Sequence, residues 1–409
     1  MKDKSSELFF LTLAILTWAL LFSYHLGFPA SEYYDEVYFV PTAREYLSLN
    51  QTTTDTAHPP LGKLFLSLSL LTFGDTPWAW RIFSLFCGSL FLFVIYYLTK
   101  ILTKNRWLAS LVTFLMAVEG IHITQSRIAM LNAQMSLWMF LSLLVLLPYL
   151  QGETEKRLRS FFFSGIFLGL TISIRWVGAG IIGIIGPLLL IKFLRDKDKL
   201  GFLRDFFMAY ILITTLIYIA SHSIIPLGQG YKWSNIFTYQ AHMARYHATL
   251  QEGHTYGSEW WGWPLLVRPI WYFFERKGTI VNGILCIGNP AIYWMIPVAM
   301  FYVLGMWLKE RKFLYGFVIF GFLSQWLPWA LIGRVKFFHY FYAAVPFALL
   351  GIALLIREIW RYGTLGKWLV CFYILLVFIM FIYWFPLWTG YPISDPSFQS
   401  HLWFKKAWI

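Results

Sequence analysis

The stretch LFFLTLAILTWALLFSYHLGFPASEYYDEVY, residues 8–38, decides the class of fold. Its first part, residues 8–26, carries no Asp, Glu, Lys or Arg, and about 20 mostly apolar residues suffice for a helix to cross a bilayer. The run lacks a small-residue cleavage site, so it predicts a first transmembrane helix rather than a signal peptide. Asp35 and Glu36 stand side by side among tyrosines about ten residues further on. The stretch therefore predicts a membrane protein with charged residues just beyond its first helix.

The composition of the chain supports this class. Of its 409 residues, 58% are hydrophobic and 13% are charged, whereas soluble proteins carry about a quarter charged residues. These values exclude a soluble globular enzyme, a disordered protein and a nucleic-acid-binding domain. Eleven apolar stretches are candidate spanning helices: 8–26, 79–99, 107–123, 130–149, 160–175, 176–194, 205–225, 291–308, 313–332, 338–356 and 366–386. We therefore expect an all-α polytopic membrane protein with about 11 transmembrane helices.

The placement of Lys and Arg predicts the orientation. With the N-terminus inside, 19 of the 33 basic residues fall in inside segments, as the positive-inside rule requires, and the C-terminus lies outside. The net charge of +13 is then mainly a topology signal. Two outside segments, 27–78 and 226–290, are too long for connectors, and within them 60–73 and 234–250 predict helices lying in the membrane interface. No repeat divides residues 1–409, so we expect a single domain with its site where the two outer loops meet the membrane.

The adjacent carboxylates Asp35 and Glu36 are the sharpest candidates for chemistry. Charges close to a bilayer are costly to desolvate and tend to be kept for function. The alternative is that Asp35 caps a helix formed by the amphipathic stretch 36–49. Both interpretations stay open at this point.

The sequence HPPLGK at residues 58–63 forms a second motif. Two prolines restrict the backbone, and Gly62 permits a close approach where a helix begins. We expect His58 and Lys63 to point from a rigid corner at the membrane surface. The alternative is a plain helix start after a loop.

Several basic residues lie at the predicted outer helix ends: Arg81, Arg127, Arg175 and Arg334 with Lys336. An arginine at membrane depth needs an anionic partner, either a carboxylate or a phosphate, unless its side chain reaches the headgroups. Four such arginines opposite a carboxylate pair favour a ligand that is a phosphate-bearing lipid.

The second outer loop contributes Tyr246-His247, His254 and Tyr256 among many tryptophans. Interfacial anchoring accounts for most of the tryptophans. No His, Cys or Asp cluster has the spacing of a zinc site, and the three scattered cysteines suggest no disulfide. We expect no metal, but a divalent cation at Asp35 and Glu36 stays open.

Together these motifs resemble the protein O-mannosyltransferase family, membrane enzymes of the GT-C glycosyltransferase class. The matching pieces run in order along nearly the whole chain: Tyr34–Phe39, His58–Lys63, Arg81, Arg127, Ser173–Gly178, His254–Ser258, Trp261–Pro264, Gly288–Pro290, Trp326–Pro328, and Pro386–Ile393 with Trp403 and Trp408. Residues 291–409 resemble the C-terminal four-helix module of the family. Two departures are Asn132, where the family usually has an acidic residue, and Thr56-Ala57, where it commonly has Asp before the His-Pro-Pro run. Asp55 is a candidate to compensate for the second.

The resemblance implies transfer of mannose from a polyprenyl-phosphate-mannose donor to Ser or Thr hydroxyls of a protein acceptor. A lipid phosphate leaves without being protonated, so one carboxylate base suffices, and direct displacement predicts inversion. We assign the catalytic roles to Asp35, as the base, and to its neighbour Glu36. The remaining assignments are Arg81, Arg127 and Arg175 at the donor phosphate, and His58, Lys63, His254 and Tyr256 as substrate-positioning residues. No cofactor is expected.

Two other functions compete with this prediction. One is a lipid-linked-sugar glycosyltransferase that acts on lipid A or on a glycan. The other is a transporter or flippase, which predicts repeated halves and polar residues at mid-helix that the sequence does not show. The large soluble domain of eukaryotic family members is absent, which indicates a bacterial-type enzyme in the inner membrane with its site on the periplasmic face. The sequence carries no signal for an oligomeric state.

Overall fold

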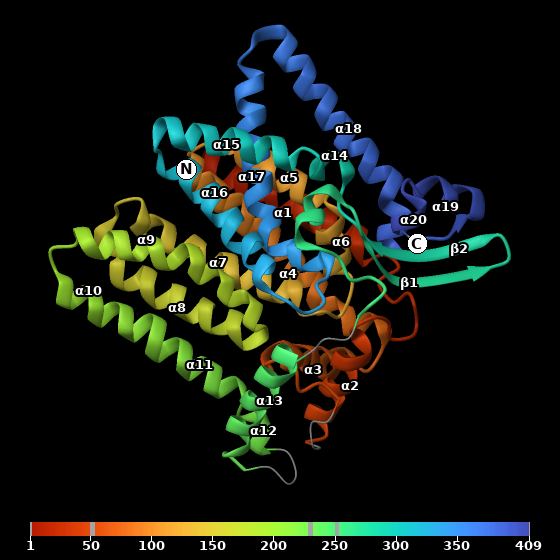
Figure 1. Ribbon diagram of the computed structural model, residues 1–409, viewed down its shortest axis with the longest axis horizontal. Helices are drawn as coiled ribbons and strands as arrows, with labels where there is room; N and C mark the ends of the chain where they lie inside the picture. The colour runs from red at the N-terminus through yellow and green to blue at the C-terminus, as the bar shows by residue number, and fades with distance from the viewer. Residues whose placement is uncertain (1, 50–53, 228–231, 250–252, 409) are drawn as a thin grey trace.

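The computed structural model describes residues 2–49, 54–227, 232–249 and 253–408 (Figure 1). Within these residues, 10 helices are long and apolar enough to cross a membrane, and a bent helix pair brings the number to 11. Each coincides with one of the eleven predicted stretches. The chain is therefore a multi-pass membrane protein, as the sequence predicted.

The N-terminal part of the chain supplies seven of the spans. Their elements are α1 (Lys2–Ser23), α4 (Pro77–Thr103), α5 (Arg106–Ala117) with α6 (Gly120–Ser126), α7 (Asn132–Leu150), η1 (Thr154–Lys156) with α8 (Arg157–Ile174), η2 (Trp176–Ile181) with α9 (Ile182–Arg195), and α10 (Lys199–Phe206) with η3 (Phe207–Ile213) and α11 (Thr214–Ser221). Four more follow: α14 (Pro290–Tyr293) with α15 (Ile296–Glu310), α16 (Phe313–Trp326) with η5 (Leu327–Leu331), η6 (Phe338–Ala344) with α17 (Val345–Trp360), and α18 (Gly363–Thr389).

The predicted span 107–123 is broken in two. The axes of α5 and α6 differ by 64°, and the break falls at Val118-Glu119. The buried Glu119 carboxylate accepts hydrogen bonds from the backbone N–H groups of Ile121 and His122, at 3.0 and 2.7 Å. A side chain that satisfies the first free N–H groups starts a new helix, which explains why an apolar run does not continue straight.

The long loops contain further elements. The first loop forms α2 (Glu36–Leu47) and α3 (Leu61–Phe73); the second forms α12 (Ile224–Leu227), α13 (Asn235–Thr249), η4 (Trp260–Leu265), β1 (Ile270–Lys277) and β2 (Ile280–Cys286); β3 (Ile393–Ser394), α19 (Asp395–His401) and α20 (Lys405–Trp408) follow α18. The helices α3 and α13 confirm helical structure over the predicted ranges 60–73 and 234–250, of which residue 250 lies outside the described residues; that they lie in the membrane interface stays a prediction.

A small antiparallel sheet, in the order β1-β2-β3, was not anticipated. Lys277 pairs with Ile280, so Gly278 and Thr279 form a two-residue turn, and Gly278 takes the positive φ of +60° that such turns require. The spans are helical as predicted. The aromatic run that we attributed to interfacial anchoring contains β1.

The spans differ in how much of their surface other spans cover. The apolar windows of α7 and of η6 with α17 are 72% and 89% buried, whereas those of α1 and α18 are only 17% buried. The first pair therefore forms the centre of the bundle and the second pair its lipid-facing edge. Figure 1 shows α2, α3 and α13 gathered at one end of the bundle and the β1-β2 hairpin projecting from its side, next to α19 and α20.

Candidate active site

Asp35 immediately precedes α2 but does not cap it. Its backbone is helical, with φ −70° and ψ −10°, and its carboxylate accepts no capping hydrogen bond. The alternative that Asp35 serves as an N-cap is therefore wrong. The carboxylate is left half-buried and available for another partner.

Glu36 points elsewhere, into a closed ion pair with Arg81. Both side chains are fully buried, and Arg81 donates to the two carboxylate oxygens at 2.8 and 2.9 Å. The backbone N–H of Ala129 also donates to Glu36, at 2.8 Å. The remaining Arg81 donors bind three carbonyls of the preceding loop: Leu26, Pro29 and Ser31. The geometry thus corrects two assignments, because neither Glu36 nor Arg81 has a group left for a substrate.

The hydrogen-bond donors of Arg127 are also used within the protein. Arg127 is 5% exposed and donates to backbone carbonyls of the end of α1, of the segment that follows α1 and of the end of α18: Phe22, Tyr24, His25 and Thr389. The structure places its guanidinium against backbone carbonyls and not where we predicted it, at a donor phosphate. Arg127 instead ties the first loop to the last spanning helix.

The HPPLGK motif folds into the corner that we expected, but with different roles for its ends. Lys63 is fully buried and forms an ion pair of 2.7 Å with Asp55. The other oxygen of Asp55 lies 3.3 Å from His58 Nδ1. Gly62 is required for packing, since a Cβ there would lie 2.7 Å from Leu131 Cδ2. Lys63 therefore supports Asp55 rather than contacting a substrate, and Asp55 orients His58.

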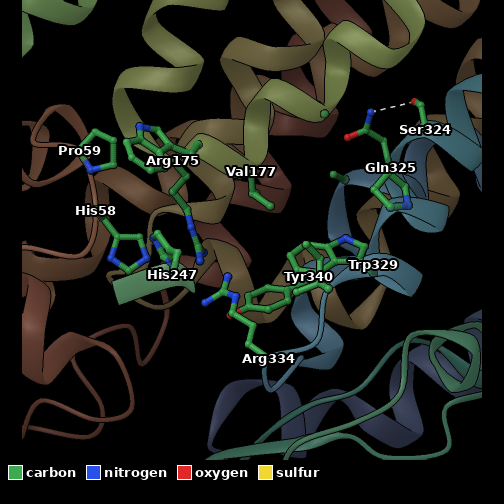
Figure 2. A pocket seen from close by; sticks show the side chains of 15 residues that line it. His58, Pro59, Arg175, Val177, His247, Ser324, Gln325, Trp329, Arg334 and Tyr340 are labelled. Carbon is green, nitrogen blue, oxygen red and sulfur yellow. Dashed lines mark hydrogen bonds between the residues drawn. The ribbon is translucent and has the colours of Figure 1, made fainter. Parts of the chain in front are cut away.

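A cavity of about 310 Å³ opens beside this corner (Figure 2). Its lining includes His58, Arg175, His247, Gln325, Arg334 and Tyr340. Figure 2 shows the two imidazoles side by side on one wall and the guanidinium groups of Arg175 and Arg334 approaching from opposite sides. The elements that meet here are the corner before α3, the end of α8, α13 and the segment after η5.

The two arginines of the cavity have no carboxylate in ion-pair contact among the described residues. Arg175 donates to the neutral side-chain amide of Asn132, which stands where the family usually has an acid. Both guanidinium groups lie near the ring of Tyr340, at 5.7 Å for Arg175 and 5.9 Å for Arg334. Their charges are therefore available to an anion.

Asp35 lies close enough to Arg175 and Tyr340 to interact with both electrostatically. Burial raises the pKa of Asp35 to about 6, against the opposing effect of Arg175 and with a further contribution from Asp55. Burial, together with the charge of Arg334, lowers the pKa of His247 to about 4. The cavity thus combines two cations and two neutral imidazoles, and a carboxylate of raised pKa, Asp35, lies within electrostatic range of one of the cations.

The predicted positioning residues His254 and Tyr256 lie outside the cavity lining. Their rings are 5.7 Å apart, and His254 is exposed and packs against Phe337. The backbone N–H of Ser258 donates a hydrogen bond of 2.8 Å to the carbonyl of Lys336 and so holds this segment to the loop before η6. The segment forms a rim next to Arg334 rather than part of the cavity wall.

Within the described residues, no group of three or more His, Cys, Asp and Glu side chains is placed to hold a metal ion. The carboxylate of Glu36 accepts from Arg81 and from backbone N–H groups, and a divalent cation at Asp35 and Glu36 stays an untested alternative. That catalysis needs no cofactor stays a prediction.

Two family models match the chain. Residues 69–222 match "Dolichyl-phosphate-mannose-protein mannosyltransferase", and residues 232–408 match the "C-terminal four TMM region of protein-O-mannosyltransferase". The chain belongs to the protein O-mannosyltransferase family. It is therefore a membrane glycosyltransferase.

Relatives and solved structures agree with this family. Polyprenol-phosphate-mannose–protein mannosyltransferase of Mycolicibacterium smegmatis is 23% identical over 90% of this chain and 86% of its own length. The enzyme of that name from Corynebacterium glutamicum is 26% identical over 91% and 88%. The S. cerevisiae protein O-mannosyltransferase Pmt1-Pmt2 complex bound to the sugar donor superposes with a TM-score of 0.84 at 15% identity, over 99% of this chain and 93% of that chain. ArnT from Cupriavidus metallidurans bound to undecaprenyl phosphate gives 0.60 at 13% identity, over 94% and 73%. The fold is thus that of the GT-C glycosyltransferases.

Two residues of this mannosyltransferase's cavity had weak signals in the sequence. Arg334 was visible as one of several arginines at helix ends, but nothing in the sequence separates it from Arg81 and Arg127. His247 stood out only as a histidine among interfacial aromatics. Whether the guanidinium of each arginine is hydrogen-bonded within the protein depends on backbone carbonyls that are distant in sequence.

Proposed function

We propose that this enzyme transfers mannose from a polyprenyl-phosphate-mannose donor to Ser or Thr hydroxyls of proteins, with Asp35 as the general base and with inversion at the anomeric carbon. The mycobacterial and corynebacterial relatives, whose names specify that donor and a protein acceptor, support the substrate classes. The donor phosphate would bind Arg175 and Arg334.

One observation carries the assignment of the base. Asp35 is an uncapped carboxylate beside a cavity whose two arginines have no carboxylate in ion-pair contact among the described residues. A phosphodiester supplies the missing negative charge. The raised pKa of Asp35 makes it a better proton acceptor while leaving it mostly ionised at pH 7.

The chemistry then needs a single displacement. The acceptor hydroxyl oxygen attacks the anomeric carbon, and its proton passes to the Asp35 carboxylate. The bond between the anomeric carbon and the phosphate oxygen breaks, and its electron pair stays on the phosphate. The phosphate gains one negative charge, which Arg175 and Arg334 stabilise. Attack from the face opposite the leaving group inverts the anomeric carbon.

The positive-inside rule supports a position of this cavity on the outer side of the membrane. Most residues that form it lie near the predicted outer ends of α8, α9, α16 and α17, and the others, His58, Pro59 and His247, belong to the two long outer loops. For a bacterial-type enzyme, this would be the periplasmic face of the inner membrane.

The test uses the full-length enzyme in lipid nanodiscs with polyprenyl-phosphate-mannose and a Ser/Thr-rich peptide, with and without a chelator. Mass spectrometry follows hexose addition to the peptide, and NMR compares the anomeric configuration of donor and product. Asp35→Asn should fold normally and lose transfer by at least about 1000-fold, a loss at the upper part of the range for general base catalysis. Glu155→Gln, at an exposed carboxylate far from the cavity, is the matched control.

Near-normal transfer by Asp35→Asn would remove Asp35 from the mechanism. Loss of transfer on chelation would show that a metal takes part. Donor consumption only with a lipid A or glycan acceptor would move the enzyme to the competing acceptor class.

A further inference from the structure

His58 is held in one orientation by contacts on three sides. Its Nδ1 atom lies 3.3 Å from a carboxylate oxygen of Asp55. The edges of its ring meet the rings of Phe39 and His247, with centroids 5.4 and 5.7 Å apart and interplanar angles of 88° and 79°. The imidazole therefore presents a defined edge to the cavity.

The bond to Asp55 determines which ring nitrogen carries the hydrogen. Asp55 is paired with the fully buried Lys63 at 2.7 Å. Burial would raise the pKa of Asp55, but Lys63 and His58 hold it well below its usual range. An ionised carboxylate can only accept, so Nδ1 of His58 must donate. In a neutral imidazole the other nitrogen, Nε2, is then a bare acceptor.

His58 is neutral at physiological pH. Burial is the largest effect that lowers the pKa of its imidazole, and the charges of Arg175 and Lys63 act in the same direction against the effect of Asp55. Within the described residues Nε2 has no hydrogen-bond partner, and unlike Nε2 of the buried His122 it is not sealed inside the protein. The cavity thus contains an unoccupied hydrogen-bond acceptor.

The chemistry of this acceptor selects a hydroxyl rather than a phosphate. A bare nitrogen lone pair repels phosphate oxygens, which in turn prefer the guanidinium groups of Arg175 and Arg334. A sugar hydroxyl can donate to the nitrogen. The rings of Trp176, Trp329 and Tyr340 line the same space and suit the apolar C–H faces of a hexose.

We propose that His58 accepts a hydrogen bond at Nε2 from a hydroxyl of the donor sugar, and that Asp55 and Lys63 are positioning residues that keep this nitrogen free of hydrogen. The inference rests on the proposed function, which supplies a sugar-phosphate donor. It adds the atom of His58 that accepts from the sugar hydroxyl, the tautomer of the imidazole, and the residues that fix this tautomer.

The experiment measures kcat/KM of the full-length enzyme for polyprenyl-phosphate-mannose and for its 2-, 3-, 4- and 6-deoxy analogues, with two matched variants. His58→Asn keeps an amide that can donate to Asp55 but has no acceptor at the place of Nε2. His58→Gln reaches that place with its amide oxygen but loses the bond to Asp55. The wild type should discriminate about tenfold against at least one deoxy donor, the size of one hydrogen bond.

We expect the kcat/KM of His58→Asn for the mannose donor to be about tenfold lower than that of the wild type. Its kcat/KM for that deoxy donor should equal its kcat/KM for the mannose donor. His58→Gln should keep most of the discrimination. Asp55→Asn should lose it, because an amide N–H facing Nδ1 moves the hydrogen to Nε2; if this variant does not fold, the two His58 variants still decide.

The inference is overturned if the wild type discriminates against no deoxy donor, or if His58→Asn discriminates as the wild type does. Absence of turnover by wild-type enzyme with the mannose donor is a different result, since it refutes the proposed function itself.

Discussion

Neutralising the adjacent carboxylates Asp35 and Glu36 one at a time should have different effects on the stability of the folded protein. Glu36→Gln leaves Arg81, which is 0% exposed, as a buried cation without a counter-charge. Removing one partner of a buried ion pair costs about 3–5 kcal/mol of folding free energy. That is a large part of the roughly 5–15 kcal/mol by which folded proteins are stable. Asp35→Asn removes a desolvated charge that no side chain of the described residues pairs, so stability should stay level or rise.

Denaturant titration of the purified protein in detergent, followed by tryptophan fluorescence, measures this difference. Glu36→Gln should unfold at a clearly lower denaturant concentration than the wild type, with an unchanged slope. The double variant Glu36→Leu/Arg81→Met is the control, because it removes both charges and should recover at least half of the loss.

Mannosyl transfer completes the comparison. At a temperature where it is folded, Glu36→Gln should keep measurable transfer, whereas Asp35→Asn should have none. A Glu36→Gln protein as stable as the wild type but inactive would refute our account of Glu36 and restore its predicted catalytic role.

Three further results are expected. Arg175→Met should lower kcat/KM for the donor by about 10–150-fold, the range for one hydrogen bond to a charged group, with unchanged unfolding. Transfer should fall about tenfold per pH unit below pH 6, because burial raises the pKa of Asp35 to about 6 and only its ionised form accepts a proton; a flat pH–rate profile between pH 4.5 and 7 would contradict this. Lys63→Met should cost about 3–5 kcal/mol of stability, since it leaves the Asp55 carboxylate buried and unpaired, and thermal unfolding by light scattering checks it.

Hydropathy located the spans well because a bilayer imposes one length and one polarity on every crossing helix. The exceptions have local causes. Glu119 ends α5 and caps α6 within one apolar run, so composition alone shows a single span. The strand β1 shares its aromatic residues with interfacial anchors, and only the turn at Gly278 distinguishes the two.

The site was predictable in part. Asp35, His58 and Arg175 were predicted from motifs; the structure places His58 and Arg175 in the lining of one cavity and Asp35 close enough to Arg175 to interact with it electrostatically. Arg81 and Arg127 were misassigned because the sequence does not show which backbone carbonyls surround a guanidinium. Arg334 differs from them only in lacking such partners within the described residues. Local pattern identifies charged residues near the membrane, but tertiary contacts decide which of those charges stay unsatisfied.

The contacts of Arg127 have a consequence for how the enzyme is made. Its guanidinium binds the segment that leads into the Asp35 loop and the carbonyl of Thr389, which lies 262 positions later in the chain. At about 5–20 residues per second, the ribosome needs some tens of seconds to cover that separation. The segment before Asp35 is therefore among the first parts of the chain to be made, and its link through Arg127 to the last spanning helix is among the last contacts to form. A chain stalled before its final helix is made would keep the contacts of Arg81 with this loop but would lack the contact between Arg127 and Thr389, so the surroundings of Asp35 are complete only once the last span is in place.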